Sequence, residues 1–169
     1  MSPNTVKNAC FIFLRSFIII NNISDLRIFI MDFTEAYLDV IKRPHKFIIG
    51  DREYRIMDVA YTPVQLANGL MNTVINEDEC MLFKFDDEKI RSFWMKNCVV
   101  PLTVLFLDHD RKVISIKHMD VEQRTIDERP EMYERRLQRY SSDAPAKYAV
   151  EIYQDKSIDS EIGSTAVFM

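Results

Sequence analysis

Glycine is scarce in this chain of 169 residues, which contains only 3 of them. So few glycines exclude a glycine-rich phosphate-binding loop and a collagen-like repeat. An excess of basic residues is also missing, because the formal net charge is −4 at pH 7 and the pI is near 5.4. General binding to nucleic acid or to anionic lipid requires a basic surface, so the composition argues against both.

Cysteine is equally scarce. Cys10, Cys80 and Cys98 are widely spaced, with no Cys-x-x-Cys motif and no histidine at metal-ligand spacing. We therefore expect reduced thiols, as in a cytoplasmic protein, and no disulfide framework. Nucleotide-binding, metal-binding and nucleophile-elbow motifs are missing too, so we predict neither a metal ion nor an organic cofactor.

The length and apolar content of the chain are sufficient for one folded domain. A chain of this size supports a single sizeable core without requiring a second one. Hydrophobic residues make up 47% and charged residues 28%, which is ordinary for a soluble globular protein. We predict a single domain over residues 31–169.

Residues 1–30 form an apolar extension whose role the sequence leaves open. The segment 9–20 is apolar except for Arg15 and Ser16, but a membrane-spanning helix needs about 20 residues. The extension is a poor export signal or anchor, an element added to the core, or translated sequence upstream of a start at Met31. We expect no transmembrane span, and a cytoplasmic location unless residues 7–20 act as a signal.

After Met31 the pattern predicts one helix and then a hairpin. Apolar residues recur with a helical period over 33–42, and Pro44 would end that helix. Two short apolar segments, 47–49 and 54–60, flank a Gly-Asp turn, which predicts two antiparallel strands.

A second helix and further strands follow. Thr62 and Pro63 are typical of a helix start, and Gly69 is typical of the position just after a helix end. Strands are predicted over 80–85, 93–95, 102–107, 113–119 and 148–152. The third and fourth of these should form an antiparallel hairpin. The predicted fold is mainly β (α+β): a small twisted antiparallel sheet or half-closed barrel of about six or seven strands, with short helices at its rim.

The segment 91–108 holds the most distinctive side chains. Trp94 is the only tryptophan, and Lys96 and Asn97 form a polar pair between two apolar runs. One interpretation is a pocket, with an aromatic wall, an ammonium group for an anion and an amide for orientation. The other is structural: Trp94 fills the core, Asn97 bonds to turn backbone and Lys96 extends to water.

Several short motifs occur in a characteristic order. They are Gly-Leu-Met at 69–71, Met-Leu-Phe at 81–83, Phe-Trp-Met-Lys-Asn at 93–97, Pro-Leu at 101–102 and Pro-Ala-x-Tyr-Ala-Val-Glu at 145–151. In this order they resemble the DUF192 family, also called UPF0127, over about residues 45–169. The family has no assigned function, so the resemblance implies no activity.

This chain departs from the family pattern near the predicted pocket. The family usually has a basic residue shortly before Gly-Leu-Met, where this chain has Ala67-Asn68, and a threonine after Lys-Asn, where it has Cys98. A ligand held through that basic residue or that hydroxyl would be bound differently here.

Residues 120–139 are dense in charge. Five arginines invite a phosphate-binding interpretation, but acidic residues alternate with them. A solvated insertion whose charges pair with one another is favoured, with a helix over 130–139.

Three functional hypotheses remain open. The first is a non-enzymatic module that binds a small anionic or sugar-like ligand, or a peptide, in a pocket rimmed by 69–71 and 94–97. The second is a hydrolase or transferase that uses Lys96, Asn97 and a carboxylate such as Asp108. The third is a structural or interaction protein that uses 120–139. The oligomeric state is not predicted. The candidate binding residues are Gly69, Met71, Trp94, Lys96, Asn97 and Asp108.

Overall fold

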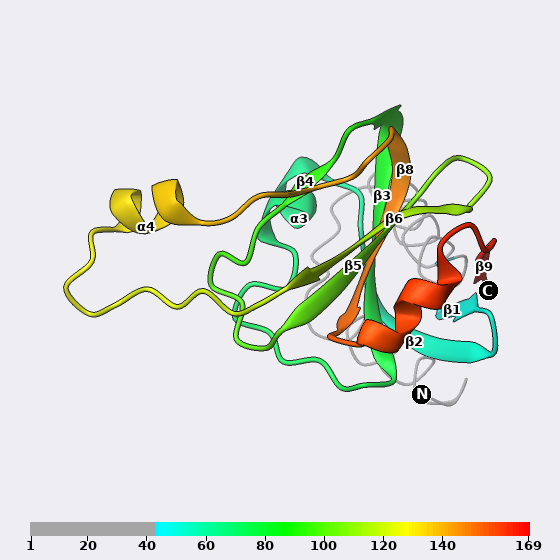
Figure 1. Cartoon of the computed structure of the whole chain (residues 1–169), viewed down its shortest axis with the longest axis horizontal. Coiled ribbons are helices and arrows are strands. Elements are labelled where there is room, and N and C mark those ends of the chain that lie inside the picture. The colour runs from blue at the N-terminus through cyan, green and yellow to red at the C-terminus, as the bar shows by residue number, and fades with distance from the viewer. Residues whose placement is uncertain (1–42) are drawn as a thin grey trace, which may run out of the picture. The chain divides into compact units, whose positions relative to one another are not determined.

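A curled seven-stranded β-sheet forms the centre of the part of the chain that the structure describes, residues 43–169 (Figure 1). The structure is a computed structural model. The N-terminal extension and the helix predicted over 33–42 lie outside the described residues. In chain order the elements are β1 (Lys46–Ile49), β2 (Arg52–Ala60), α3 (Pro63–Asn68), β3 (Glu79–Lys89), β4 (Ser92–Phe93), β5 (Leu102–Leu107), β6 (Val113–Met119), α4 (Pro130–Arg136), β7 (Tyr140–Ser141), β8 (Ala146–Tyr153), the 3-10 helix η1 (Lys156–Glu161) and β9 (Val167–Phe168).

The strand order in the large sheet is β6-β5-β8-β3-β2-β1-β9, and β4 pairs with β7 in a separate two-stranded ribbon. This confirms the prediction of a mainly β, half-barrel fold. The pairs are antiparallel except for β2 and β3, which run parallel. Parallel neighbours need a crossover connection, and α3 with its following loop supplies it.

Local sequence signals place the first elements. Gly50 has a positive φ of 57° in the turn of the β1–β2 hairpin. Thr62 caps α3 in a capping box, in which the Gln65 backbone N–H donates to Thr62 Oγ1 and the Thr62 N–H donates to Gln65 Oε1. The predictions of this hairpin, and of a helix that begins at Pro63 and ends before Gly69, are confirmed.

Other boundaries differ from the predictions. The strand predicted over 93–95 ends at Phe93, because the backbone turns there toward a positive φ at Asn97. The strand predicted over 80–85 is longer, since β3 continues to Lys89 beyond the pairing with β8. The predicted β5–β6 hairpin is confirmed.

The C-terminal segment links the two ends of the curled sheet. β9 pairs with β1, while Thr165 forms a bridge with Lys112 just before β6. The Gly163 N–H donates to the Val113 carbonyl at 2.9 Å, where Gly163 has a positive φ of 87°. The sheet is therefore drawn toward a barrel.

Strand β5 is buried on both faces, and its side chains divide between two apolar clusters. Leu105 and Leu107 belong to the first, which is packed among β1, β2, β8 and η1. Leu102, Val104 and Phe106 belong to the second, which also contains Leu70 and Met95 from the loops. Alternate residues of a strand point to opposite faces, so one strand serves both cores.

An arm over residues 121–139 projects from the sheet and carries α4 (Figure 1). Tyr133 is buried and anchors it, because its hydroxyl donates to the Glu122 carbonyl at 2.7 Å and accepts the Asn97 N–H at 2.9 Å. Within the arm, Arg136 pairs with Glu128 at 2.7 Å. Within residues 43–169, no helix is long and apolar enough to cross a membrane.

Leu105→Ala should lower the free energy of unfolding by about 2–5 kcal/mol, because it opens a cavity in a fully buried strand. Urea titration followed by the fluorescence of Trp94, the only tryptophan, measures this change. Val74→Ala, at an exposed loop position, is the control and should change stability by less than about 0.5 kcal/mol. Equal stability of the two variants would contradict the two-sided burial of β5.

Candidate functional site

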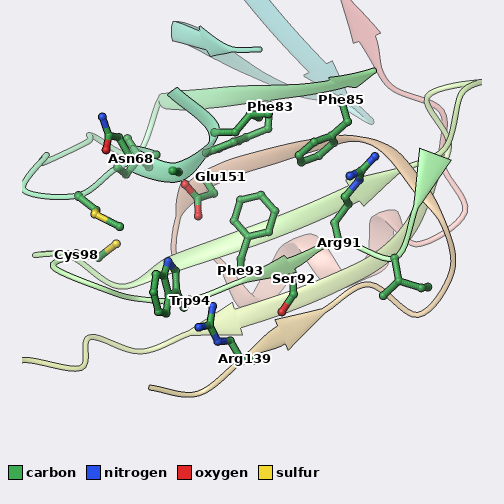
Figure 2. A pocket seen from close by; sticks show the side chains of 16 residues that line it. Asn68, Phe83, Phe85, Arg91, Ser92, Phe93, Trp94, Cys98, Arg139 and Glu151 are labelled. Carbon is green, nitrogen blue, oxygen red and sulfur yellow. The ribbon is translucent and has the colours of Figure 1, made fainter. Parts of the chain in front are cut away.

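A pocket of about 380 Å³ lies on the face of the sheet that holds the second apolar cluster (Figure 2). Its wall on one side is α3 and the loop after it, and on the other side the β4 segment. The lining residues are 66–71, 90–94, Phe83, Phe85, Cys98, Arg139 and Glu151.

Glu151 reaches the pocket because of its register on β8. Its neighbours Val150 and Ile152 point into the first cluster, and Ala149, two residues away, points into the second. Alternation therefore directs Glu151 to the pocket side. It pairs with Met81 of β3 and Val104 of β5, so its surroundings within the sheet are apolar.

The Glu151 carboxyl is buried and has no partner among residues 43–169. The residue is 3% exposed. Within residues 43–169, no hydrogen-bond donor or basic side chain pairs with it, so those residues would not compensate a charge here. Burial alone raises its pKa to about 8, and the group is accordingly a neutral carboxylic acid at pH 7.

Gly69 allows the α3 loop to approach this carboxyl closely. A Cβ atom at Gly69 would lie 3.3 Å from Phe83 Cζ and 3.8 Å from Glu151 Oε2. Gly69 also has a positive φ of 46°, a conformation that other residues adopt rarely. The glycine that ends α3 therefore also shapes the pocket wall.

Aromatic rings form much of the remaining wall. Phe83 and Phe93 meet edge to face with their centroids 4.9 Å apart, and Phe93 meets Phe106 in the same way at 5.5 Å. Trp94, at the end of β4, adds a large ring. Rings held in this way give a fixed apolar surface against which a ligand can pack.

Two arginines stack on rings at opposite ends of the pocket (Figure 2). The Arg91 guanidinium lies 4.0 Å from the Phe85 centroid and the Arg139 guanidinium 3.7 Å from the Trp94 ring. Arg91 also forms an ion pair within the protein, because its Nη2 is 2.5 Å from Asp87 Oδ1. Arg139 has no ion pair or hydrogen bond to any other residue that the structure describes.

Cys98 contributes a thiol next to Glu151. Burial, with a smaller effect of the nearby Glu151 carboxyl, raises the pKa of Cys98 to about 12. A thiol of this pKa is not ionised at neutral pH and is a poor nucleophile. Within residues 43–169, no three His, Cys, Asp or Glu side chains gather closely enough to hold a metal ion.

Three of the six sequence-based candidates line the pocket, namely Gly69, Met71 and Trp94. Lys96 does not: it forms an ion pair with Glu134 of the arm, and its Nζ lies 5.3 Å from the Trp94 ring. The other two are found in turns, outside the pocket lining.

Asn97 and Asp108 lie in turns, where they take part in hydrogen bonds with backbone groups. Asn97 has a positive φ of 55°, and its carbonyl accepts the Asn72 N–H at 2.8 Å. Asp108 begins the β5–β6 turn, where its Oδ1 accepts the N–H groups of Asp110 and Lys112, each at 2.9 Å. The structure therefore does not bring Lys96, Asn97 and Asp108 together at one cleft.

Sequence reasoning did not select Glu151, Arg91 or Arg139 as site residues. For Glu151 a signal is present, since it is a lone acid in the otherwise apolar run 149–152. A charged residue in a buried strand is rare unless it is paired, and this makes it a candidate. The arginines carry no such signal, because their neighbourhood depends on how β4 and β7 pair.

A Thr-His-Asp chain elsewhere resembles a catalytic triad but is structural. Thr103 Oγ1 lies 2.9 Å from His118 Nδ1, and His118 Nε2 lies 3.0 Å from Asp159 Oδ1. Thr103 is fully buried, and its oxygen accepts the Asp155 N–H at 3.2 Å. A substrate cannot reach this hydroxyl.

The sequence profile of the DUF192 family, described as "Uncharacterized ACR, COG1430", matches residues 47–165. The chain belongs to the DUF192 family. The pocket of this DUF192 protein lies within the matched region. No curated protein is significantly similar to the chain in sequence.

Two solved structures share the fold of this DUF192 protein. One is a protein of unknown function from Novosphingobium aromaticivorans DSM 12444, with a TM-score of 0.57 and 22% identity, over 73% of this chain and 84% of that one. The other is a "putative transcription regulator" from Sinorhizobium meliloti 1021, with a TM-score of 0.55 and 23% identity, over 73% of this chain and 90% of that one. Identities this low support a shared fold and nothing more.

Glu151→Gln should stabilise the protein increasingly as the pH rises. The folded state keeps the Glu151 proton between its ordinary pKa of 4.5 and about 8, while the unfolded chain releases it. The contribution of this carboxyl to the free energy of unfolding is therefore fully present below pH 4.5 and is lost as the pH rises toward 8. Near pH 8 the free energy of unfolding of Glu151→Gln should exceed that of the wild type by an amount on the order of 4 kcal/mol. Urea titrations across the pH range measure this difference.

Glu79→Gln is the matched control, because Glu79 is also buried but has a lowered pKa. The backbone N–H of Asn76 is the main cause, and it donates to Glu79 Oε2 at 2.9 Å. This carboxylate stabilises the fold above its ordinary pKa and loses that effect as the pH falls, so Glu79→Gln should destabilise the protein at pH 7. A pH-independent difference between Glu151→Gln and wild type would contradict an unpaired buried carboxyl.

Proposed function

We propose that this DUF192 protein is a binding module for a small ligand, which enters the pocket between α3 and β4. One observation carries the proposal: the buried Glu151 carboxyl, which has no partner among residues 43–169, faces an aromatic-lined pocket. Burying an unpaired polar group costs stability, and a ligand that pairs with it would offset that cost. Small-molecule sites typically occupy about 300–1,000 Å³ and combine apolar walls with a few polar groups, as this pocket does.

The lining supplies distinct kinds of contact. Phe83, Phe93 and Trp94 offer ring surfaces, and Glu151 offers a carboxyl that both donates and accepts while it is protonated. Arg139 adds an exposed cation at the Trp94 end. The candidates Gly69 and Met71 contribute to the α3 side of the same wall.

Chemistry by Lys96 and Asn97 is less well supported. Lys96 is paired with Glu134, and neither Lys96 nor Asn97 lines the pocket. Asp108 holds the β5–β6 turn through backbone hydrogen bonds. A hydrolase or transferase would need these groups, or an activated Cys98, at one point in the cleft.

Protein interaction through the arm is a second candidate function. Ile126 is 94% exposed and Met132 is also exposed on this projecting, charged segment. Ile126→Asp should weaken self-association if two copies meet through the arm, as measured by sedimentation velocity over a concentration series. An unchanged monomer in both proteins would argue against this mode.

A thermal-shift screen of the full chain tests the pocket proposal. The library contains small organic anions, sugars and sugar acids, amino acids and short peptides. A ligand at one hundred times its dissociation constant stabilises the folded state by about 2.7 kcal/mol, which raises Tm.

Two tryptophan substitutions on the same helix localise any hit. Ala67→Trp narrows the pocket from an exposed position of α3 that lines it, and should abolish the shift. Val64→Trp is the matched control, since Val64 is exposed on α3 but does not line the pocket. A library without hits, or a hit that survives Ala67→Trp, would defeat the proposal.

A further inference from the structure

We infer that the ligand of this pocket is an α-amino acid, or a close relative of one, with a large apolar side chain. Its ammonium group pairs with Glu151, its apolar body lies against the rings, and its carboxylate reaches Arg139. The inference rests on the proposed function, because it names the ligand class of the same pocket.

The Glu151 side of the pocket suits a cation. Glu151 is 3% exposed, and the part of the chain that the structure describes supplies no basic partner for its carboxylate. An amide side chain would serve equally well for a neutral hydroxyl ligand and would not risk a buried charge. A carboxyl differs from an amide in that it can ionise and pair with a cation, so its presence favours a ligand with an ammonium group.

The described residues around Glu151 do not provide a cation. Met81 on β3 and Val104 on β5 flank it in the sheet, and Gly69 approaches from the α3 loop. The other titratable or charged lining groups are the Cys98 thiol and the guanidinium groups at the two ends. Neither arginine lowers the pKa of Glu151, which is raised by burial alone.

The Arg139 side of the pocket favours an anion. Arg139 is exposed and stacked on Trp94, and none of its donors is used by another described residue. Arg91, which stacks on Phe85 on the far side of the pocket from Arg139, already pairs with Asp87. A ligand carboxylate can therefore take two donors from Arg139 without breaking an existing ion pair.

Aromatic rings border the space beside Glu151 and Arg139. Phe83 and Phe93 meet edge to face, and Figure 2 shows the Glu151 side chain directed into the region that these rings border. An apolar side chain on the ligand would pack against the rings and exclude water from the ion pair, which strengthens it. The ammonium group, the carboxylate and the side chain of an α-amino acid branch from one carbon, so the two charged groups can be directed to Glu151 and Arg139 while the side chain packs against the rings.

Four probes separate the parts of this inference. L-phenylalanine has both charged groups, N-acetyl-L-phenylalanine lacks the ammonium group, and L-phenylalaninamide lacks the carboxylate. Glucuronate, a sugar acid, represents a ligand without an amine. We expect isothermal titration calorimetry to show L-phenylalanine binding about tenfold or more tightly than the N-acetyl compound, and severalfold more tightly than the amide.

Proton release gives an independent readout. At pH 6.5 the free protein holds the Glu151 proton, so pairing with an ammonium group should release about one proton per ligand to the buffer. Titrations in buffers of different ionisation enthalpy measure this number. Glu151→Gln should abolish the release and weaken L-phenylalanine binding by about tenfold or more.

Arg139→Gln tests the outer contact separately. It should reduce the affinity for L-phenylalanine to that for L-phenylalaninamide, while the affinity for the amide changes little. A variant that loses affinity for both probes equally would show that Arg139 does not meet the carboxylate.

The failures are distinguishable. N-acetyl-L-phenylalanine binding as tightly as L-phenylalanine, or binding without proton release, overturns the ammonium pairing. Glucuronate or another library member binding in place of the amino acid, with loss in Ala67→Trp, overturns the ligand class but leaves the pocket function intact. No binding by any probe or library member overturns both.

Discussion

The burial of β5 and β8 on both faces is the constraint on which the rest of the structure depends. β5 and residues 149–152 of β8 supply apolar side chains to two cores, so an acid within 149–152 enters a largely apolar environment in whichever direction it points. Glu151 is such a residue on β8. Its position is set by the register with β3 and β5, and a shift by one residue would move Val150 to the pocket and Glu151 into the first core.

The pocket results from how the crossover between β2 and β3 is built. A parallel pair requires the chain to return over one face of the sheet, and the short helix α3 performs that return. Six residues of helix and a loop are too small to cover the face completely, and the β4–β7 ribbon closes the other side only in part. The space left between them is the pocket, so the same topology that closes the fold leaves Glu151 facing a cavity.

The local elements were predictable because their signals are local. The ends of α3 are set by helix capping and backbone preference at Thr62, Pro63 and Gly69, and strand alternation places most of the core.

The site was only half predictable. Trp94 stands out in the sequence as the only tryptophan, whereas the stacking of Arg139 on its ring depends on a chain reversal through the arm. Lys96 and Asn97 looked functional because they are polar within an apolar stretch, but the arm bonds to both.

Fold stability and the proposed ligand binding place opposite demands on residue Glu151. The described residues around the carboxyl do not pair with it. Because the folded state keeps the Glu151 proton while the unfolded chain releases it, the folded state loses stability as the pH rises. A glutamine would fill the same volume without this cost, so the stability of the fold gives no reason for an acid here. Groups that are costly in the free protein and suited to a charged partner are typical of binding sites. The physical case for a ligand therefore rests on a buried acid that faces a pocket and has no counter-charge among residues 43–169.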